Sequence, residues 1–136
     1  MTGAATVAAG AERAGIFSEF GVAIRGADPV AFFTEGAALE GRQTNAYTWR
    51  GAKWLFVSAA NRDRFAATPE TFLPAYGGWC AWAMTRGILA KTDPTAWLIE
   101  DGRLYLNFDH RTRQRFQRDV PGNIAKADEV WQTDFS

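Results

Sequence analysis

The chain of 136 residues is poor in the side chains that most often carry chemistry. It holds one cysteine (Cys80), one histidine (His110) and a single methionine inside the chain, Met84. One cysteine excludes an intramolecular disulfide and the thiolate sets of structural zinc sites and iron–sulfur clusters. One histidine excludes zinc sites built on two or three histidines, the two-histidine iron triad and blue-copper sites. Only a mixed metal site, or one shared between subunits, fits this composition.

Several large functional classes are also missing from the sequence. It has no GxxxxGK[ST], GxGxxG, GxSxG or HExxH pattern, which removes the usual motif routes to nucleotide binding, serine hydrolysis and zinc proteolysis. Fifteen basic residues balance fifteen acidic ones, so no whole-chain attraction to nucleic acid or to an anionic membrane is expected. No apolar run approaches the roughly 18 residues of a membrane helix. We therefore expect no nucleic-acid partner and no membrane span.

Aromatic residues, in contrast, are abundant: six Trp, ten Phe and three Tyr. Apolar residues make up 47% of the chain and charged residues 22%, as is typical of a soluble globular protein. At this length folding removes roughly two thirds of the chain's surface from water. We expect one domain with one aromatic-rich core.

The N-terminus has a composition of its own. The first fifteen residues are rich in Ala and Gly but lack the basic start and the Leu-rich centre of a secretory signal. We interpret residues 1–19 as a flexible leader, or as the remnant left when a signal was removed. Residues 20–136 then form the folded domain.

Turn signals predict the strands. Residues 97–107 read as a hairpin with a type I′ turn at Asp101-Gly102, and residues 47–58 as a second hairpin around Gly51. A short strand is expected within residues 21–26. Loops are predicted at residues 35–45 and 88–95.

Helices are predicted where an N-cap residue precedes a proline or a helical run. They cover residues 29–33, 61–65, 69–73, 80–86, 109–118 and 124–131. Pro121-Gly122-Asn123 is expected to break the chain between the last two. The predicted fold is a small α+β domain, with short antiparallel β-hairpins packed with several short helices around an aromatic-rich core.

Five segments, taken in order, carry a family resemblance. They are Gly21–Phe33, Trp54–Arg62, Tyr76–Ala81, Asp101–Asn107 and Asn123–Asp128. Over roughly residues 20–131 the chain resembles the bacterial YHS-domain proteins. The resemblance implies a small module of a metal-associated kind. Members with a metal role use paired cysteines, whereas the segment around Val57 has none.

The resemblance also bears on location. Many similar proteins carry a secretory leader, which implies that this chain is periplasmic or secreted. A cytoplasmic location is the alternative, because the N-terminal residues of this sequence form no signal peptide.

Cys80 is the leading candidate site residue. It follows a glycine pair and Trp79 at the start of a predicted helix, where free N–H groups and the helix dipole favour a thiolate. Met84 lies four residues on, on the same face, so the two sulfurs could hold a soft ion such as Cu(I). The alternative is that both are core residues, since free Cys is often buried and Met fills gaps.

Three further side chains are candidate ligands or proton-handling partners for Cys80. They are Tyr76, Asp28 and His110. Asp28 can instead be a helix N-cap before Pro29, and His110 can be an exposed residue at a helix start. Four residues could shape a pocket around the sulfur, either by close backbone approach or by their aromatic rings: Gly77, Gly78, Trp79 and Trp82.

These residues support three hypotheses. The first is a non-enzymatic binding module that holds copper or a small ligand near Cys80, with about one Cu(I) bound and lost in Cys80→Ala. The second is an enzyme that uses Cys80 as nucleophile or redox centre. The third is a protein-interaction domain, which a large exposed aromatic patch would favour.

Overall fold

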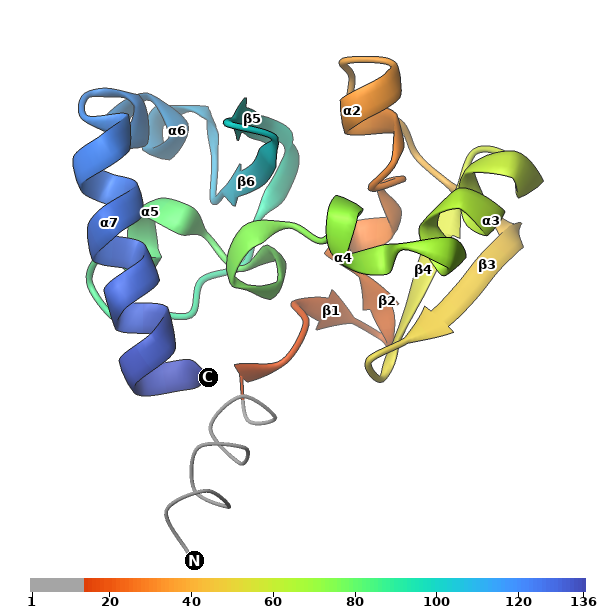
Figure 1. Cartoon of the computed structure of the whole chain (residues 1–136), viewed down its shortest axis with the longest axis horizontal. Helices are drawn as coiled ribbons and strands as arrows, with labels where there is room; N and C mark the ends of the chain where they lie inside the picture. The colour runs from red at the N-terminus through yellow and green to blue at the C-terminus, as the bar shows by residue number, and fades with distance from the viewer. Residues whose placement is uncertain (1–13) are drawn as a thin grey trace, which may run out of the picture.

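The computed structural model describes residues 14–136. In this part of the chain the elements form two lobes that lie side by side (Figure 1). One lobe holds strands β1–β4 with helices α2–α4, and the other holds β5, β6 and α5–α7. The predicted α+β class with antiparallel hairpins and short helices is confirmed.

The first lobe is built on a sheet in the order β1-β2-β4-β3. The strands are β1 (Ser18–Glu19), β2 (Val22–Ala23), β3 (Arg42–Trp49) and β4 (Ala52–Phe56). Arg50 and Gly51 both have positive φ, 52° and 76°, so the predicted hairpin closes with the left-handed backbone of a type I′ turn. β3 begins at Arg42, inside the segment predicted as a loop, because its first residues pair with the end of β4.

Short helices fill the rest of this lobe. They are η1 (Ile24–Gly26), α2 (Ala31–Thr34), α3 (Ala59–Ala67) and α4 (Pro69–Phe72). Ser58 caps α3 by accepting a hydrogen bond from the Asn61 N–H at 3.1 Å. The strand expected over residues 21–26 is only two residues long, since Ile24 and Arg25 turn into the left-handed region.

The chain crosses between the lobes through η2 (Ala75–Gly78) and α5 (Ala81–Met84). The second lobe continues with β5 (Asp93–Glu100) and β6 (Arg103–Asn107). Asp101 and Gly102 turn the hairpin with φ of 56° and 76°, which confirms the predicted type I′ link. β5 starts at Asp93, so the end of the loop predicted over residues 88–95 is strand instead.

Helices α6 (His110–Gln117) and α7 (Val120–Val130) follow, and a π-helical turn, η3 (Trp131–Phe135), continues α7. The break predicted at Pro121-Gly122-Asn123 is wrong. Asp119 is the N-cap and accepts from the Gly122 N–H at 3.1 Å. Pro121 therefore stands in the first helical turn, where the missing N–H costs nothing.

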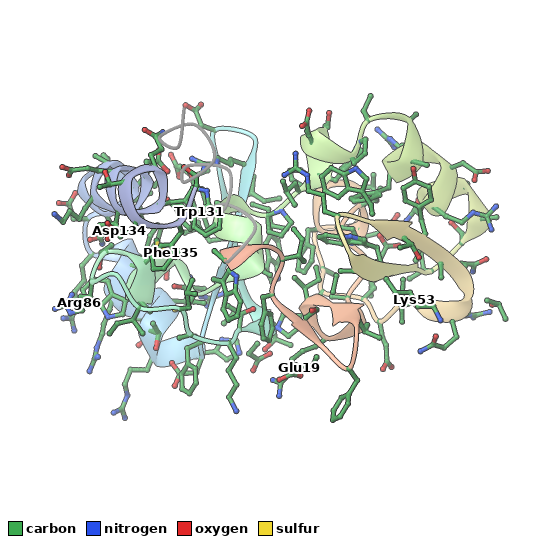
Figure 2. All side chains as sticks on the ribbon, turned by 90° about the horizontal axis from the view of Figure 1, so that it is seen from below. Glu19, Lys53, Arg86, Trp131, Asp134 and Phe135 are labelled. Carbon is green, nitrogen blue, oxygen red and sulfur yellow. The ribbon has the colours of Figure 1, made fainter. Side chains whose placement is uncertain are left out.

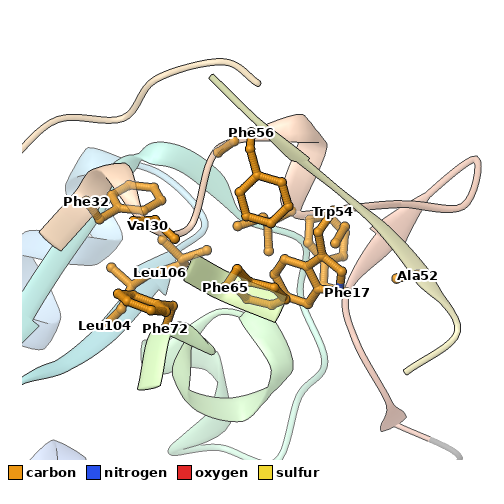
Figure 3. Close-up of a cluster of buried hydrophobic side chains, with 13 residues drawn as sticks. Phe17, Val30, Phe32, Ala52, Trp54, Phe56, Phe65, Phe72, Leu104 and Leu106 are labelled. Carbon is orange, nitrogen blue, oxygen red and sulfur yellow. The ribbon is translucent and has the colours of Figure 1, made fainter. Parts of the chain in front are cut away.

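Buried apolar side chains form two clusters in the described part of the chain. In the first, the Phe65 ring lies 5.1 Å from the Trp54 ring and 5.2 Å from the Phe56 ring (Figure 3). The second gathers Tyr76, Met84, Tyr105 and Phe116 with three alanines, one of which, Ala127, lies on α7. The aromatic-rich core is thus divided between the lobes.

Residues 14–19 belong to the fold rather than to the predicted leader. Phe17 is buried in the first cluster and Ser18–Glu19 pairs as β1. Residues 1–13, the remainder of the predicted leader, lie outside the described residues. Within residues 14–136 no helix has the length and apolarity needed to cross a membrane.

Candidate ligand pocket

A pocket of about 800 Å³ opens where the two lobes meet. Its walls come from the segment before β1, the β3–β4 turn, α4, η2, the start of β6, and η3 with the residue after it. The lining residues include apolar, aromatic and charged side chains, among them Ile16, Arg50, Glu70, Tyr76, Arg103 and Trp131. Trp131 lies on the side of its helix that faces the other lobe (Figure 2).

Four side chains form a polar network at the Tyr76 side of this pocket. The Tyr76 hydroxyl donates to Asp128 Oδ1 at 2.8 Å, and Arg103 Nη1 donates to Oδ1 and Oδ2 of Asp128 at 3.0 and 3.3 Å. The same nitrogen lies 3.3 Å from the Tyr105 hydroxyl. The Arg103 guanidinium carbon is 5.4 Å from the ring centroid of each tyrosine, within cation–π range.

The network raises the pKa of its members Tyr76 and Arg103. Burial, followed by the hydrogen bond to Asp128, raises the pKa of Tyr76 far above its ordinary value. Burial works against the charged form of Arg103, yet the neighbouring Tyr105 and Asp128 outweigh it and the pKa of Arg103 is raised. The pocket therefore presents a neutral phenol and a permanent cation at neutral pH.

Arg103 keeps unused hydrogen-bonding capacity. A guanidinium has five N–H donors, and the hydrogen bonds of Arg103 to residues 14–136 all start from Nη1. The side chain is 42% exposed. Its Nε and Nη2 atoms have no hydrogen-bond partner within residues 14–136.

A second ion pair stands at the opposite rim. Arg50 Nη2 lies 3.2 Å from Glu70 Oε2, with side-chain exposures of 52% and 76%. The Arg50 guanidinium also stacks over the Trp49 ring at 4.5 Å. Because both charges are well solvated, this pair contributes little to stability and its partners can exchange.

Tyr76 lines the pocket from a strained, left-handed backbone conformation. Tyr76 and Gly77 have φ of 60° and 66°, a left-handed conformation that is unfavourable for a tyrosine. A Cβ on Gly77 would collide with the carbonyl oxygen of Gly15, and the Phe17 N–H donates to the Gly77 carbonyl at 2.9 Å. The close backbone approach predicted for the glycine pair is thus made by the chain's own segment at residues 15–17.

The other predicted pocket residues hold the same segment or lie apart from it. A Cβ on Gly78 would come within 2.6 Å of the Ile24 side chain. Trp79 Nε1 donates to the Ala14 carbonyl at 3.1 Å, and its ring is 5.1 Å from that of Phe17. Trp82 instead stacks under Arg86 at 4.5 Å.

Cys80 is fully buried and is the N-cap of α5 rather than a residue within the helix. Its sulfur accepts from the Ala83 N–H at 3.4 Å and the Phe108 N–H at 3.3 Å. Burial raises the pKa of the thiol, and these N–H groups offset only part of that rise. The predicted donors are present at the helix start, but the thiol form is favoured.

The thiol also faces a buried amide. Cys80 Sγ lies 3.7 Å from Asn107 Oδ1, which accepts from the Trp82 N–H at 3.1 Å. Asn107 Nδ2 is buried and has no hydrogen-bond partner within residues 14–136. Met84 is fully buried in the second cluster, as the core interpretation of the two sulfur residues expects.

Asp28 is engaged elsewhere, in the first lobe. Oδ1 accepts from the N–H groups of Val30 (2.8 Å) and Ala31 (3.2 Å). Oδ2 accepts from the Val57 N–H and from Asn61 Nδ2, both at 2.9 Å. The carboxylate caps the start of α2 and ties it to the β4–α3 junction, so its hydrogen bonds do not join it to Cys80.

His110 is exposed at the first position of α6. Its Nε2 lies 3.0 Å from Thr95 Oγ1, and this hydroxyl also donates to Asp93 Oδ1 at 2.8 Å. His110 has no hydrogen bond to the Cys80 sulfur, whose partners are Ala83, Asn107 and Phe108.

The predicted site residues therefore separate into groups. Tyr76 and Gly77 line the pocket, Cys80 and Met84 are buried near α5, and Asp28 and His110 serve other contacts. Within residues 14–136 no group of three or more His, Cys, Asp or Glu is placed to hold a metal ion.

Sequence reasoning did not bring Arg103, Tyr105, Asp128 and Trp131 together in one site. Two periodicities could have found them. Arg103 and Tyr105 are two apart on a strand and so share a face. Asp128 and Trp131 are three apart on a helical stretch and are neighbours on its surface.

Comparison with models of protein families, with curated proteins and with solved structures finds no match for this chain.

Proposed function

We propose that the protein is a small-molecule-binding module whose ligand lies in the pocket beside Tyr76 and Arg103. The observation that carries this proposal is a concave site of about 800 Å³, within the range of small-molecule sites in proteins. Of the two alternatives in the binding hypothesis, copper and a small ligand, this proposal keeps the small ligand. It places the binding site at the junction of the lobes instead of near Cys80.

The walls have the composition of a ligand site. Ile16, Leu73, Pro74 and Trp131 offer apolar surface, and Arg103 offers oriented N–H donors. Such sites combine an apolar lining with a few fixed polar groups. The hydrogen bonds to Asp128 and the two tyrosine rings hold Arg103 in place before a ligand arrives.

The surroundings of Cys80 suit the other hypotheses less well. The polar atoms that contact its sulfur are two backbone N–H groups and the Asn107 amide, none of which is a general base or a second soft ligand. Copper binding at Cys80 stays a prediction, tested by titration with Cu(I) of the wild type and Cys80→Ala.

Nuclear magnetic resonance screening with a library of aromatic and aliphatic fragments tests the pocket. We expect hits to shift the amide signals of residues that line it, such as Tyr76 and Arg103. Thr71 is exposed and lines the pocket, so Thr71→Trp should fill the space and remove these shifts.

Thr44→Trp is the matched control, because Thr44 is exposed on β3 and lies outside the pocket lining. This variant should bind fragments as the wild type does. Absence of hits at the pocket, or equal binding by Thr71→Trp and wild type, would rule out the proposed function.

A further inference from the structure

We infer that the pocket selects an organic anion, with one carboxylate or phosphate group on an apolar body, and that the free edge of Arg103 binds the charged group. This inference rests on the proposed function, and it adds the class of ligand and the residue that recognises it.

The balance of charge on the walls favours an anion. Two guanidinium groups, Arg50 and Arg103, line the pocket against the single carboxylate side chain of Glu70. Asp128, the partner of Arg103, is not among the lining residues. A ligand therefore meets the positive side of that ion pair.

The geometry of Arg103 suits a planar anion. Asp128 and Tyr105 both take hydrogen bonds from Nη1, which leaves Nε and Nη2 as a pair of parallel donors. Carboxylate and phosphate groups accept such a pair in the bidentate manner. A lysine would supply the positive charge but not the pair of parallel N–H donors.

The second pocket that Arg103 lines is bordered by negative charge. Arg103 and Tyr105 also line a smaller pocket of about 440 Å³, together with Glu100 and Asp101. Two carboxylates there disfavour an anion. The anion is therefore directed to the larger pocket, where Arg50 adds to the favourable potential.

The number of charges that can be matched is small. Arg50 already faces Glu70 at 3.2 Å, so a single guanidinium has a free edge toward the ligand. Much of the remaining wall is apolar, including Leu73, Pro74 and Trp131. A compact polyanion would leave charge unpaired against this surface, which is costly.

Naphthoate, naphthyl phosphate and neutral naphthamide test the inference by isothermal titration calorimetry on the full chain. We expect the wild type to bind at least one of the two anions about tenfold or more tightly than the amide, as charge-assisted hydrogen bonds provide. Comparing the two anions identifies the preferred group.

Two variants assign the selectivity to Arg103. Arg103→Gln should reduce anion binding to the level of the amide, and Arg103→Lys should recover only part of it. Asp128→Asn should weaken anion binding severalfold, because it removes the carboxylate that holds the guanidinium in place. Arg118→Gln removes an exposed charge outside the pocket and should change nothing.

The outcomes separate the two proposals. If no probe binds in the pocket and the fragment screen also fails, the proposed function is wrong. If the amide binds as tightly as both anions, or if folded Arg103→Gln keeps the selectivity, the pocket is a ligand site but the inferred class of ligand is wrong. Asp128→Asn remains a test if Arg103→Gln fails to fold.

Discussion

The hydroxyl of Tyr76 donates a hydrogen bond of 2.8 Å to Asp128, which lies 52 positions further along the chain. It joins the crossing segment η2 to helix α7 and sets one wall of the pocket. Tyr76→Phe removes this bond and keeps the ring. We expect a loss of about 1 kcal/mol in the free energy of unfolding, measured by urea denaturation. A variant as stable as the wild type would show that the bond contributes nothing.

The same phenol makes stability depend on alkaline pH. The pKa of Tyr76 is raised from its ordinary value of 10.0, first by burial and then by the bond to Asp128. The unfolded chain therefore releases this proton at a lower pH than the folded chain does. Stability from this group is present below pH 10 and falls as the pH rises above it. Tyr76→Phe should have a shallower alkaline loss of stability, and an unchanged slope would contradict this.

Asp28 should be among the most sensitive positions for stability. In Asp28→Asn the amide nitrogen replaces an oxygen that accepts from the Val57 N–H and from Asn61 Nδ2, so donors would face donors. We expect a loss of about 2 to 4 kcal/mol in chemical denaturation. Asp63→Asn is the control, because the Asp63 side chain is 71% exposed. Equal stability of the two variants would contradict the role of Asp28.

The two glycines with similar φ should respond differently to alanine. Gly51 and Gly77 have φ of 76° and 66°, but a Cβ meets no atom within 4 Å at Gly51 and collides with the Gly15 carbonyl at Gly77. Gly51→Ala should cost about 1 kcal/mol from backbone strain alone. Gly77→Ala should cost clearly more and should displace residues 15–17, as amide exchange of Phe17 would show. Equal losses of stability in the two variants would show that the close approach of Gly77 to Gly15 does not limit the side chain at position 77.

Cys80 should be unreactive while the protein is folded. Its side chain is fully buried and its pKa is raised by burial, so both access and the thiolate form are disfavoured. An aromatic disulfide reagent at mildly alkaline pH should label it only at the rate of unfolding, and at once in denaturant. Fast labelling of the folded protein would instead favour the hypotheses based on a reactive sulfur.

Local signals allowed much of the fold to be predicted. The hairpin at Asp101-Gly102 and the helix starts at Ser58 and Asp109 depend on a few adjacent residues, and each cap bond is present. Pro121 misled the prediction because a proline can begin a helix as readily as end one. The predicted strand began later than β3 does, because the start of β3 is determined by pairing with β4 rather than by its own composition.

The candidate site could be predicted only in part, because distant residues assemble it. Tyr76 was named as a possible partner of Cys80, whereas its contacts in the structure are Asp128 and Arg103, from a helix and a strand further along the chain. Two of the four acceptor contacts of Asp28 likewise extend 29 and 33 positions along the chain, to Val57 and Asn61. No spacing in the sequence shows such contacts.

Strand β6 ties the two halves of the molecule together. Leu104 and Leu106 point into the first hydrophobic cluster, and Tyr105, between them, packs in the second. A shift of the strand by one residue would exchange these faces and remove the side chains of β6 from both clusters. The two-residue turn at Asp101-Gly102 therefore sets the strand register on which both clusters depend. Because both lobes share this strand, we expect them to unfold in one cooperative transition.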